Sequence, residues 1–161
     1  MDIRRARPEE YKDAGELIVA AYLALPGGQM SEGYADELRA VSRRAAEAEV
    51  LVATAEGRLA GCVTLVPDPV SPWAELLEGG EAGIRMLAVL PSAQGRGIGR
   101  GLLDACVDRA RELGCKAVLL HTTPWMEVAQ KMYERAGFER CPERDWTPVP
   151  EVPLLCYRLV L

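Results

Sequence analysis

The sequence predicts an α/β domain, of the α+β type with a mixed β-sheet, and three observations carry that prediction. Between Ile84 and Ala136 β-rich runs alternate with helical ones, which favours parallel strands joined by crossovers. Two β-rich runs between Val50 and Val66 flank Glu56-Gly57-Arg58, the pattern of an antiparallel hairpin. The chain has 161 residues and is 49% hydrophobic, enough to enclose one core. We therefore expect a single domain over residues 1–161.

The first part of the chain predicts one strand and two helices. Residues 1–6 alternate like an edge strand, and residues 7–25 form a helical pattern with Pro8 in its first turn. The Pro26-Gly27-Gly28 sequence ends that helix. A second helix is predicted over residues 31–48, because Ser31 is a favourable N-cap residue and good helix formers follow.

The remaining elements alternate after the hairpin. Residues 67–80, rich in proline and glycine, predict a loop in which Trp73 either packs on the core or borders a site. The elements predicted after it are strand 84–90, helix 97–113, strand 116–121, helix 126–136 and strands 138–142 and 153–160. The predicted order is βααβββαβαββ.

Composition and charge exclude several classes of function. The formal charge is −5, and only three of the 19 basic residues are lysine, so there is no basic surplus to indicate nucleic acid as a partner. The longest apolar run, Leu17 to Leu25, is about half of a bilayer span, and no signal-peptide pattern opens the chain. We expect a cytoplasmic protein without a membrane partner.

Five cysteines are spread along the chain. Their spacings fit neither a metal-ligand pair nor a disulfide framework. We expect reduced and mostly buried thiols, and no metal.

A glycine-rich loop stands between strand 84–90 and helix 97–113, and three kinds of ligand site compete to explain it. A dinucleotide fingerprint G-x-G-x-x-G fails in every register, because Arg100, Leu102 or Asp104 takes the last position. A nucleotide phosphate loop needs Lys followed by Ser or Thr, which this loop lacks. A nest of backbone N–H groups at a helix start, able to hold phosphate, remains, beside the alternative of a glycine-rich turn that only aids packing.

Two motifs resemble those of one known family. "LAVLPSAQGRGIGRGLL", with Gln94, Gly97 and Gly99, is similar to the acetyl-CoA motif of the GNAT (Gcn5-related) N-acetyltransferase superfamily. "AQKMYERAGF", with Tyr133, is similar to the family's fourth helix. The matching positions run from about Ile84 to Phe138, and the predicted element order agrees with the family's fold, whose mixed central sheet is splayed.

The resemblance implies a binding site for acetyl-CoA as cosubstrate. It implies that the Leu87 N–H faces the thioester carbonyl and that Ala88 and Val89 bond the pantetheine arm as a pseudo-strand. The residues implied to cradle or contact the pyrophosphate are Gln94, Gly95, Arg96, Gly97, Ile98, Gly99 and Arg100.

The resemblance also implies direct attack of a primary amine, on a small molecule or peptide, on the bound thioester. The Leu87 N–H would then stabilise the tetrahedral oxyanion. Tyr133, protonated at neutral pH, is the candidate general acid for the leaving sulfur; the alternative is core packing, because it also borders an apolar helix stripe.

The general base is left open. Deprotonating a lysine-like amine at pH 7 costs about 4.6 kcal/mol, and an α-amine only about 1.4 kcal/mol, so water suffices for some substrates. His121, the single histidine, ends a strand near the acyl site and is one candidate. Glu81 is the weaker one: many relatives carry an acidic residue at the position of Gly83, and Glu81 lies on the same strand face.

Other positions bear on cofactor and acceptor binding. Relatives often carry an asparagine seven residues before the tyrosine, where this chain has Met126, which cannot donate a hydrogen bond. Trp146 is either a wall of the acceptor site or a contact with a second subunit, so a homodimer is an open possibility. Four acidic residues near the expected cleft would favour a cationic amine unless they are simply solvated: Glu32, Asp36, Glu143 and Asp145.

Two other functions stay open beside the transferase. The second hypothesis is a sensor in which the same fold binds an acyl-CoA without turnover, and the third is a nucleotide-dependent enzyme in which the glycine loop holds another phosphate ligand.

Overall fold

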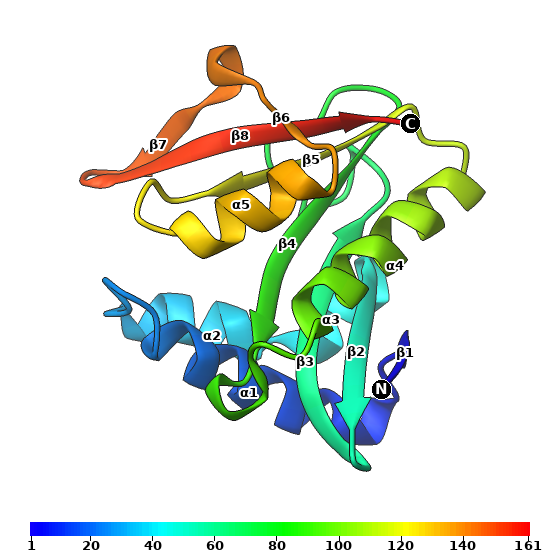
Figure 1. Cartoon of the computed structure of the whole chain (residues 1–161), viewed down its shortest axis with the longest axis vertical. Coiled ribbons are helices and arrows are strands. Elements are labelled where there is room, and N and C mark those ends of the chain that lie inside the picture. Colours follow the sequence, from blue (N-terminus) through cyan, green and yellow to red (C-terminus); the bar gives the residue numbers. More distant parts are fainter.

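An eight-stranded, mostly antiparallel sheet organises the chain, and the computed structural model describes all 161 residues (Figure 1). The strands lie in the order β1-β2-β3-β4-β5-β8-β6, and β7 pairs with β8. They are β1 (Asp2–Arg5), β2 (Glu49–Ala55), β3 (Arg58–Val66), β4 (Glu81–Val89), β5 (Ala117–Thr122), β6 (Glu139–Arg140), β7 (Trp146–Val149) and β8 (Val152–Val160). Only β4 and β5 pair in parallel, so the predicted mixed sheet is confirmed.

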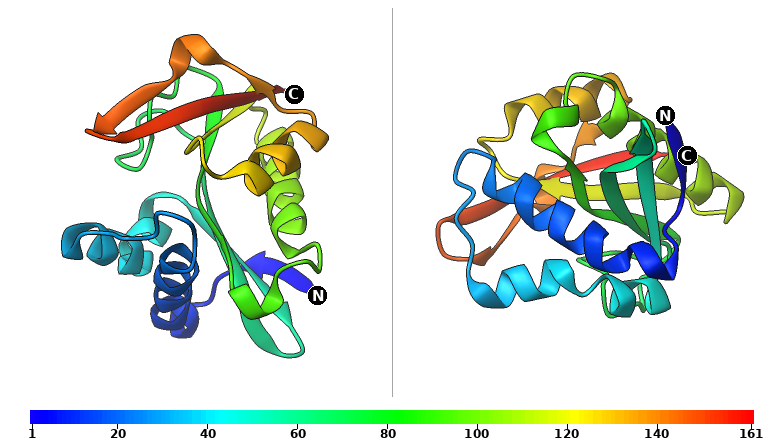
Figure 2. Two further views of the ribbon diagram at one scale, coloured as in Figure 1. Left: turned by 60° about the vertical axis from the view of Figure 1, so that its left-hand side comes forward. Right: turned by 90° about the horizontal axis from the view of Figure 1, so that it is seen from below.

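Helices cover both faces of the sheet (Figure 2). They are α1 (Tyr11–Leu23), α2 (Glu32–Arg39), α3 (Val41–Glu47), α4 (Ile98–Glu112) and α5 (Glu127–Arg135). Three single turns of 3₁₀ helix are η1 (Pro8–Glu10), η2 (Pro91–Ala93) and η3 (Pro142–Arg144). On one face, α1 packs Ile18 with Val52 and Met86. On the other, α4 and α5 bury Leu102 and Tyr133 in a second cluster.

The helix predicted over residues 31–48 is two helices, α2 and α3, which is a correction. Ser31 caps α2 as expected, accepting a hydrogen bond from the Tyr34 N–H at 3.1 Å. The helical conformation is interrupted at Ala40, whose ψ of 48° is not helical. The break removes the helical i+4 donors of two carbonyls, of Glu37 and Leu38, and the fully buried Arg44 guanidinium donates to both, at 2.7 and 3.0 Å. That interaction gives the break its stability.

The C-terminal region contains three strands where two were predicted. The missed strand, β7, carries Pro148 and pairs with β8 through Trp146↔Leu154 and Val149↔Val152. Proline is tolerated there because β7 pairs on one side only and an edge strand can lack N–H donors. With the split helix, the observed order is βαααβββαβαβββ.

Strands β4 and β5 separate partway along their length, as the splayed sheet was expected to do. Four pairs join them, ending at Ile84↔Leu120, and β4 continues for five more residues without a partner on the β5 side. In Figure 1 the two strands lie side by side at one end and diverge toward the other. The divergence begins at Arg85 on β4 and His121 on β5.

Three features concern membrane association, the state of the cysteines and metal binding. None of the helices is both long and apolar enough to span a membrane. All five cysteines are free, and four of them are buried. No group of three or more His, Cys, Asp or Glu side chains is arranged to hold a metal ion.

Candidate functional site

The unpaired edge of β4 presents main-chain groups to the gap beside β5. The Leu90 N–H donates to the Ala60 carbonyl of β3 at 2.9 Å. Because bonded and non-bonded pairs alternate along an antiparallel ladder, the N–H and C=O of Val89 point away from β3, toward the gap. The N–H and C=O of Ala88, expected to bond the pantetheine, are directed to β3 instead.

A β-bulge turns the edge at the point of divergence. The register between β3 and β4 shifts between Cys62 and Thr64, and Met86 in the bulge has a φ of 55°. Such a conformation is rare for a residue with a side chain and is often found at functional sites. The alternation that directs Val89 to the gap directs the Leu87 N–H there as well.

The glycine loop leaves a run of backbone donors without partners. From Gly95 to Arg100, six consecutive N–H groups donate to no backbone or side-chain acceptor, and the first donor with one is Gly101, to Gly97 at 2.9 Å. Gly95 and Gly97 both have φ of 80°, and an added Cβ at either would meet nothing within 4 Å. The loop is exposed, so its donors are open to a ligand. This arrangement fits a phosphate group.

Side chains near this loop differ in their availability. Arg100 is paired with Asp104 one turn along α4, at 2.9 Å. Arg96 reaches only Glu56, at 3.9 Å, and its side chain is 54% exposed, so it is the freer cation. Gln94 is exposed, with its amide 3.5 Å from the Val89 carbonyl, and Ile98 is buried in the core.

Tyr133 lies on α5 with its ring packed in the core and its hydroxyl unbonded. The side chain is 7% exposed, and its ring lies 5.9 Å from that of Tyr157 and 6.2 Å from that of Phe138. Its hydroxyl makes no hydrogen bond within the protein, and the residue lines the cavity described below. Burial raises the pKa of Tyr133 to about 12, so the phenol stays protonated at neutral pH. The packing and site interpretations of Tyr133 are therefore compatible.

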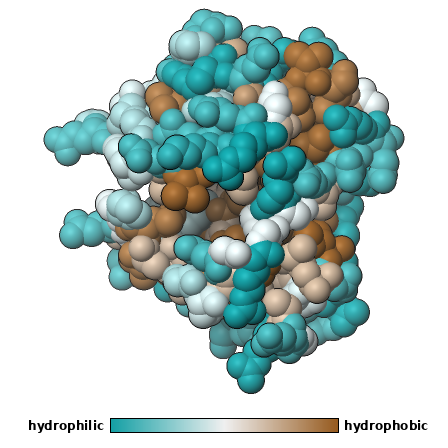
Figure 3. Space-filling model, viewed as in Figure 1, coloured by the Kyte–Doolittle hydropathy of each residue, from teal (hydrophilic) through white to brown (hydrophobic).

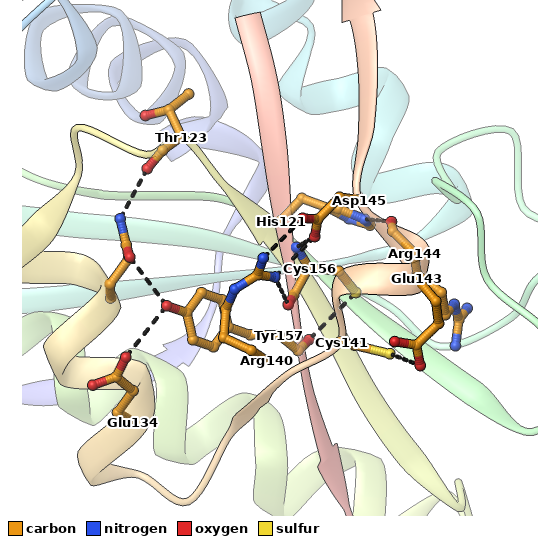
Figure 4. A network of polar contacts seen from close by, with 11 residues as sticks. His121, Thr123, Glu134, Arg140, Cys141, Glu143, Arg144, Asp145, Cys156 and Tyr157 are labelled. Atoms are coloured by element: carbon orange, nitrogen blue, oxygen red, sulfur yellow. Dashed lines mark hydrogen bonds and ion pairs between the residues drawn. The ribbon is translucent and has the colours of Figure 1, made fainter.

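His121 lies on β5, and the residue before it, Leu120, is the last that pairs with β4. Its Nε2 is 3.1 Å from the Arg144 carbonyl oxygen (Figure 4). Its ring meets that of Trp146 edge to face, with the ring centroids 6.5 Å apart. Burial lowers the pKa of His121, and the bond to the Arg144 carbonyl offsets part of that effect. A neutral imidazole is thus favoured at pH 7. Leu120, in the core with Tyr133, faces the opposite side of β5 from His121.

Glu81 is not available as a base, which corrects that candidate. Its carboxylate is 1% exposed and accepts hydrogen bonds from Arg144 at 2.7 and 2.8 Å, from Arg158 at 3.0 Å and from the Glu78 N–H at 2.9 Å. Burial alone would raise the pKa of Glu81, but these bonds outweigh it and lower the pKa to about 2. A carboxylate held this way has no capacity to take a proton near neutral pH.

A cavity of about 900 Å³ opens beside the diverging strands. Figure 3 shows the molecule hollowed there, with apolar patches around the opening. Of the nine aromatic residues in the chain, six line this cavity: Tyr22, Tyr34, Trp73, Trp125, Tyr133 and Trp146. Trp73 both packs in the core and lines the cavity, and Trp146 is a wall of it.

The charges in the cavity differ from those expected. None of Glu32, Asp36, Glu143 and Asp145 lines it. Asp145 binds Arg140 through both oxygens at 2.8 Å, and Glu143 accepts from the Cys141 thiol at 3.0 Å (Figure 4). The carboxylates that do line the cavity are Glu37 and Glu75.

Several cavity residues were missed by sequence reasoning. Arg85 lines the cavity at the point of divergence, forms an ion pair with Glu75 and donates to the Trp73 carbonyl at 3.2 Å. A charged residue inside a β-rich run was the available signal for Arg85.

Trp125 lies against Gly27, whose φ is 71°; an added Cβ there would be 3.3 Å from the indole Nε1. Nothing local in the sequence indicates that contact, which joins segments about 100 residues apart.

Met126 lies at the start of α5. It lines the cavity and is the N-cap residue, but makes no capping hydrogen bond. The donor that an asparagine would supply is therefore absent.

Comparisons with known proteins agree with this geometry. Residues 16–138 match the model of the Acetyltransferase (GNAT) family. The chain is similar to an IAA acetyltransferase of Azospirillum brasilense, 34% identical over 101 residues, which cover 62% of this chain and 61% of the relative. The chain thus spans about three fifths of that relative.

Solved structures share the fold over the whole chain. A ribosomal-protein-alanine N-acetyltransferase from Brucella melitensis has a TM-score of 0.74 at 21% identity, with all of both chains covered. A GNAT family acetyltransferase from the same organism, solved in complex with acetyl-CoA, has a TM-score of 0.66 at 25% identity, covering 99% of this chain and 87% of that one.

Proposed function

Since the chain belongs to the acetyltransferase (GNAT) family, we propose that it transfers an acetyl group from acetyl-CoA to a primary amine of a small molecule or peptide. The observation that carries this proposal is the run of six unpartnered N–H groups from Gly95 to Arg100, beside the unpaired edge of β4. Phosphate and an extended amide-bearing chain are the ligands that such donors and such an edge accept. Coenzyme A carries both in one molecule.

The residues have separate roles in this proposal. The N–H groups of residues 95–100 hold the diphosphate, with Arg96 the freer of two nearby cations. Val89 pairs with the pantetheine arm through its N–H and C=O. The Leu87 N–H donates to the thioester carbonyl oxygen as negative charge develops there. Acetyl-CoA, when bound, supplies the activated acyl group.

Protons move at two side chains on opposite faces of β5. Tyr133 donates from its unbonded hydroxyl to the leaving sulfur. His121, on the face toward η3 and Trp146, takes the proton of an amine that water does not deprotonate readily. The acceptor occupies the cavity with aromatic walls, where the Arg85–Glu75 pair and Glu37 provide the fixed charges.

Two measurements test the proposal. In a thermal-shift panel on protein freed of copurified ligand, acetyl-CoA and CoA should raise Tm, whereas NAD and ATP should not. A thiol-release assay with acetyl-CoA and pools of amines should then give free CoA that depends on both the enzyme and the amine. No Tm shift with CoA would refute the proposal. Binding without turnover across broad pools would favour a non-catalytic acyl-CoA sensor instead.

A further inference from the structure

A chain of polar contacts runs from the buried Glu81 to His121. The Arg144 guanidinium binds both Glu81 oxygens at 2.7 and 2.8 Å, and also donates to the Leu76 carbonyl at 2.7 Å. The carbonyl of the same residue, Arg144, accepts from His121 Nε2 at 3.1 Å. Glu81 is in turn fixed by Arg158 and the Glu78 N–H. The ion pair thus anchors the backbone group that the imidazole contacts.

The contact with Arg144 selects one tautomer of His121. A carbonyl oxygen can only accept, so Nε2 must carry the hydrogen. In the neutral ring the bare lone pair is then on Nδ1. His121 lines the cavity at the point where β4 and β5 diverge, so Nδ1 is the nitrogen left for a substrate proton.

Burial, aided by the positive charge of Arg144, favours the neutral ring of His121. The Arg144 carbonyl, Asp145 after η3 and Glu75 from the loop before β4 act in the opposite direction, and Trp146 covers one side of the ring. Asp145 is held by Arg140, and Glu75 by Arg85, so neither carboxylate forms a hydrogen bond with the imidazole. An imidazole without a carboxylate partner accepts a proton only transiently, as a base should.

We propose that Glu81 and Arg144 are positioning residues that hold His121 in the Nε2–H tautomer, with Nδ1 as the proton acceptor for the attacking amine. This inference rests on the proposed function. As the N–C bond forms and the thioester C–S bond breaks, Nδ1 takes the amine proton. The sulfur keeps the C–S electron pair and receives a proton from Tyr133. Proton exchange with water then returns His121 and Tyr133 to their starting states.

The single histidine makes the tautomer directly measurable. In protein labelled with ¹⁵N-histidine, long-range ¹H–¹⁵N spectra at pH 7 to 8 report on each ring nitrogen without any assignment problem. We expect a protonated-type signal at Nε2 and a bare-type signal at Nδ1. A hydrogen on Nδ1, or an imidazolium ring, would overturn the inference without any variant being needed.

Variants test whether the ion pair does the positioning. Arg144→Ala, which leaves Glu81 its bonds to Arg158 and the Glu78 N–H, should give a mixture of tautomers, and Glu81→Gln should do the same if it folds. Glu78→Gln is the matched control, because the Glu78 side chain is exposed and makes no hydrogen bond or ion pair, and its spectrum should match wild type.

Kinetics separate positioning from general damage to the structure. In Arg144→Ala, kcat/KM for a lysine-like amine should fall about tenfold or more, with Kd for CoA within about twofold of wild type. Added to His121→Gln, the change should cost almost nothing further. An unchanged tautomer, or a full additional loss in the double variant, would overturn the positioning role. Loss of CoA binding by the wild-type protein would instead refute the proposed function.

Discussion

Replacing Tyr133 with phenylalanine removes one hydroxyl from the centre of the proposed site. That hydroxyl makes no hydrogen bond within the protein, so its loss leaves no buried partner unsatisfied. The rings of Phe138 and Tyr157 still pack against the new side chain. We expect the free energy of unfolding to change by less than about 0.5 kcal/mol. Tyr133→Phe therefore isolates chemistry from folding.

The expected kinetic effect is much larger than the structural one. A general acid contributes about 10²- to 10⁴-fold to rate, which corresponds to about 2.7 to 5.5 kcal/mol of transition-state stabilisation. Because burial raises the pKa of Tyr133 to about 12, the wild-type enzyme should lose no activity through its ionisation below about pH 11. The variant should lower kcat and leave Kd for CoA unchanged.

The assay measures the release of CoA thiol. The amine used is one for which a single-turnover experiment shows that the chemical step limits the rate. Urea denaturation and calorimetric titration with CoA provide the controls for folding and binding. A variant that keeps wild-type turnover under these conditions would refute the acid assignment and leave Tyr133 a packing residue.

Three further predictions concern the loop, the ion-pair network and the start of α5. Gly97→Ala places a side chain at a φ of 80°, with nothing nearby to clash. It should lower the free energy of unfolding, measured by urea denaturation, by about 1 to 2 kcal/mol and weaken CoA binding. The control Gly33→Ala, at an ordinary helical position, should not destabilise the protein. The folded-state pKa of Glu81 lies near 2, below its ordinary 4.5. The stability that Glu81 contributes is therefore complete above about pH 5 and is lost as pH falls toward 2. Denaturation curves over this range should show a loss of about 3 kcal/mol, and Glu81→Gln should abolish that loss. Met126→Asn should raise stability by about 1 kcal/mol as an N-cap and tighten Kd for CoA, since the amide adds a donor; an unchanged Kd would show that the missing asparagine does not limit binding.

Local signals in the sequence predicted most of the fold. The Glu56-Gly57 turn, with φ of 55° and 75°, joins the strands of the expected hairpin. The break at Ala40 was not predictable, because good helix formers surround it and its stability comes from Arg44 folding back onto two carbonyls. Local propensity was overridden there by a tertiary contact. Strand β7 was missed because Pro148 within it and Pro150 after it obscured the β pattern.

The candidate site was predictable where it depends on the main chain. The glycine spacing and the helix start that follows predicted a nest of N–H donors, since backbone conformation alone sets them, and the resemblance to the family's motif implied its extent, residues 95–100. Side-chain charge was less predictable. Glu81 was a candidate base because it lies on the same strand face as position 83. Its ion pairs with Arg144 and Arg158 were not predictable, because those residues are 63 and 77 positions away in the sequence. The acidic residues expected at the cleft find partners or solvent outside it.

The most direct test of the account is a ¹H–¹⁵N titration of the backbone amides with CoA. If the unpartnered donors hold the diphosphate and the edge of β4 holds the pantetheine, the largest shifts should fall on Gly95 to Arg100, Val89 and Leu87. Amides on the far edge of the sheet, such as those of β1, should stay unchanged. Binding that leaves residues 95–100 unshifted, or no binding at millimolar CoA, would contradict the account.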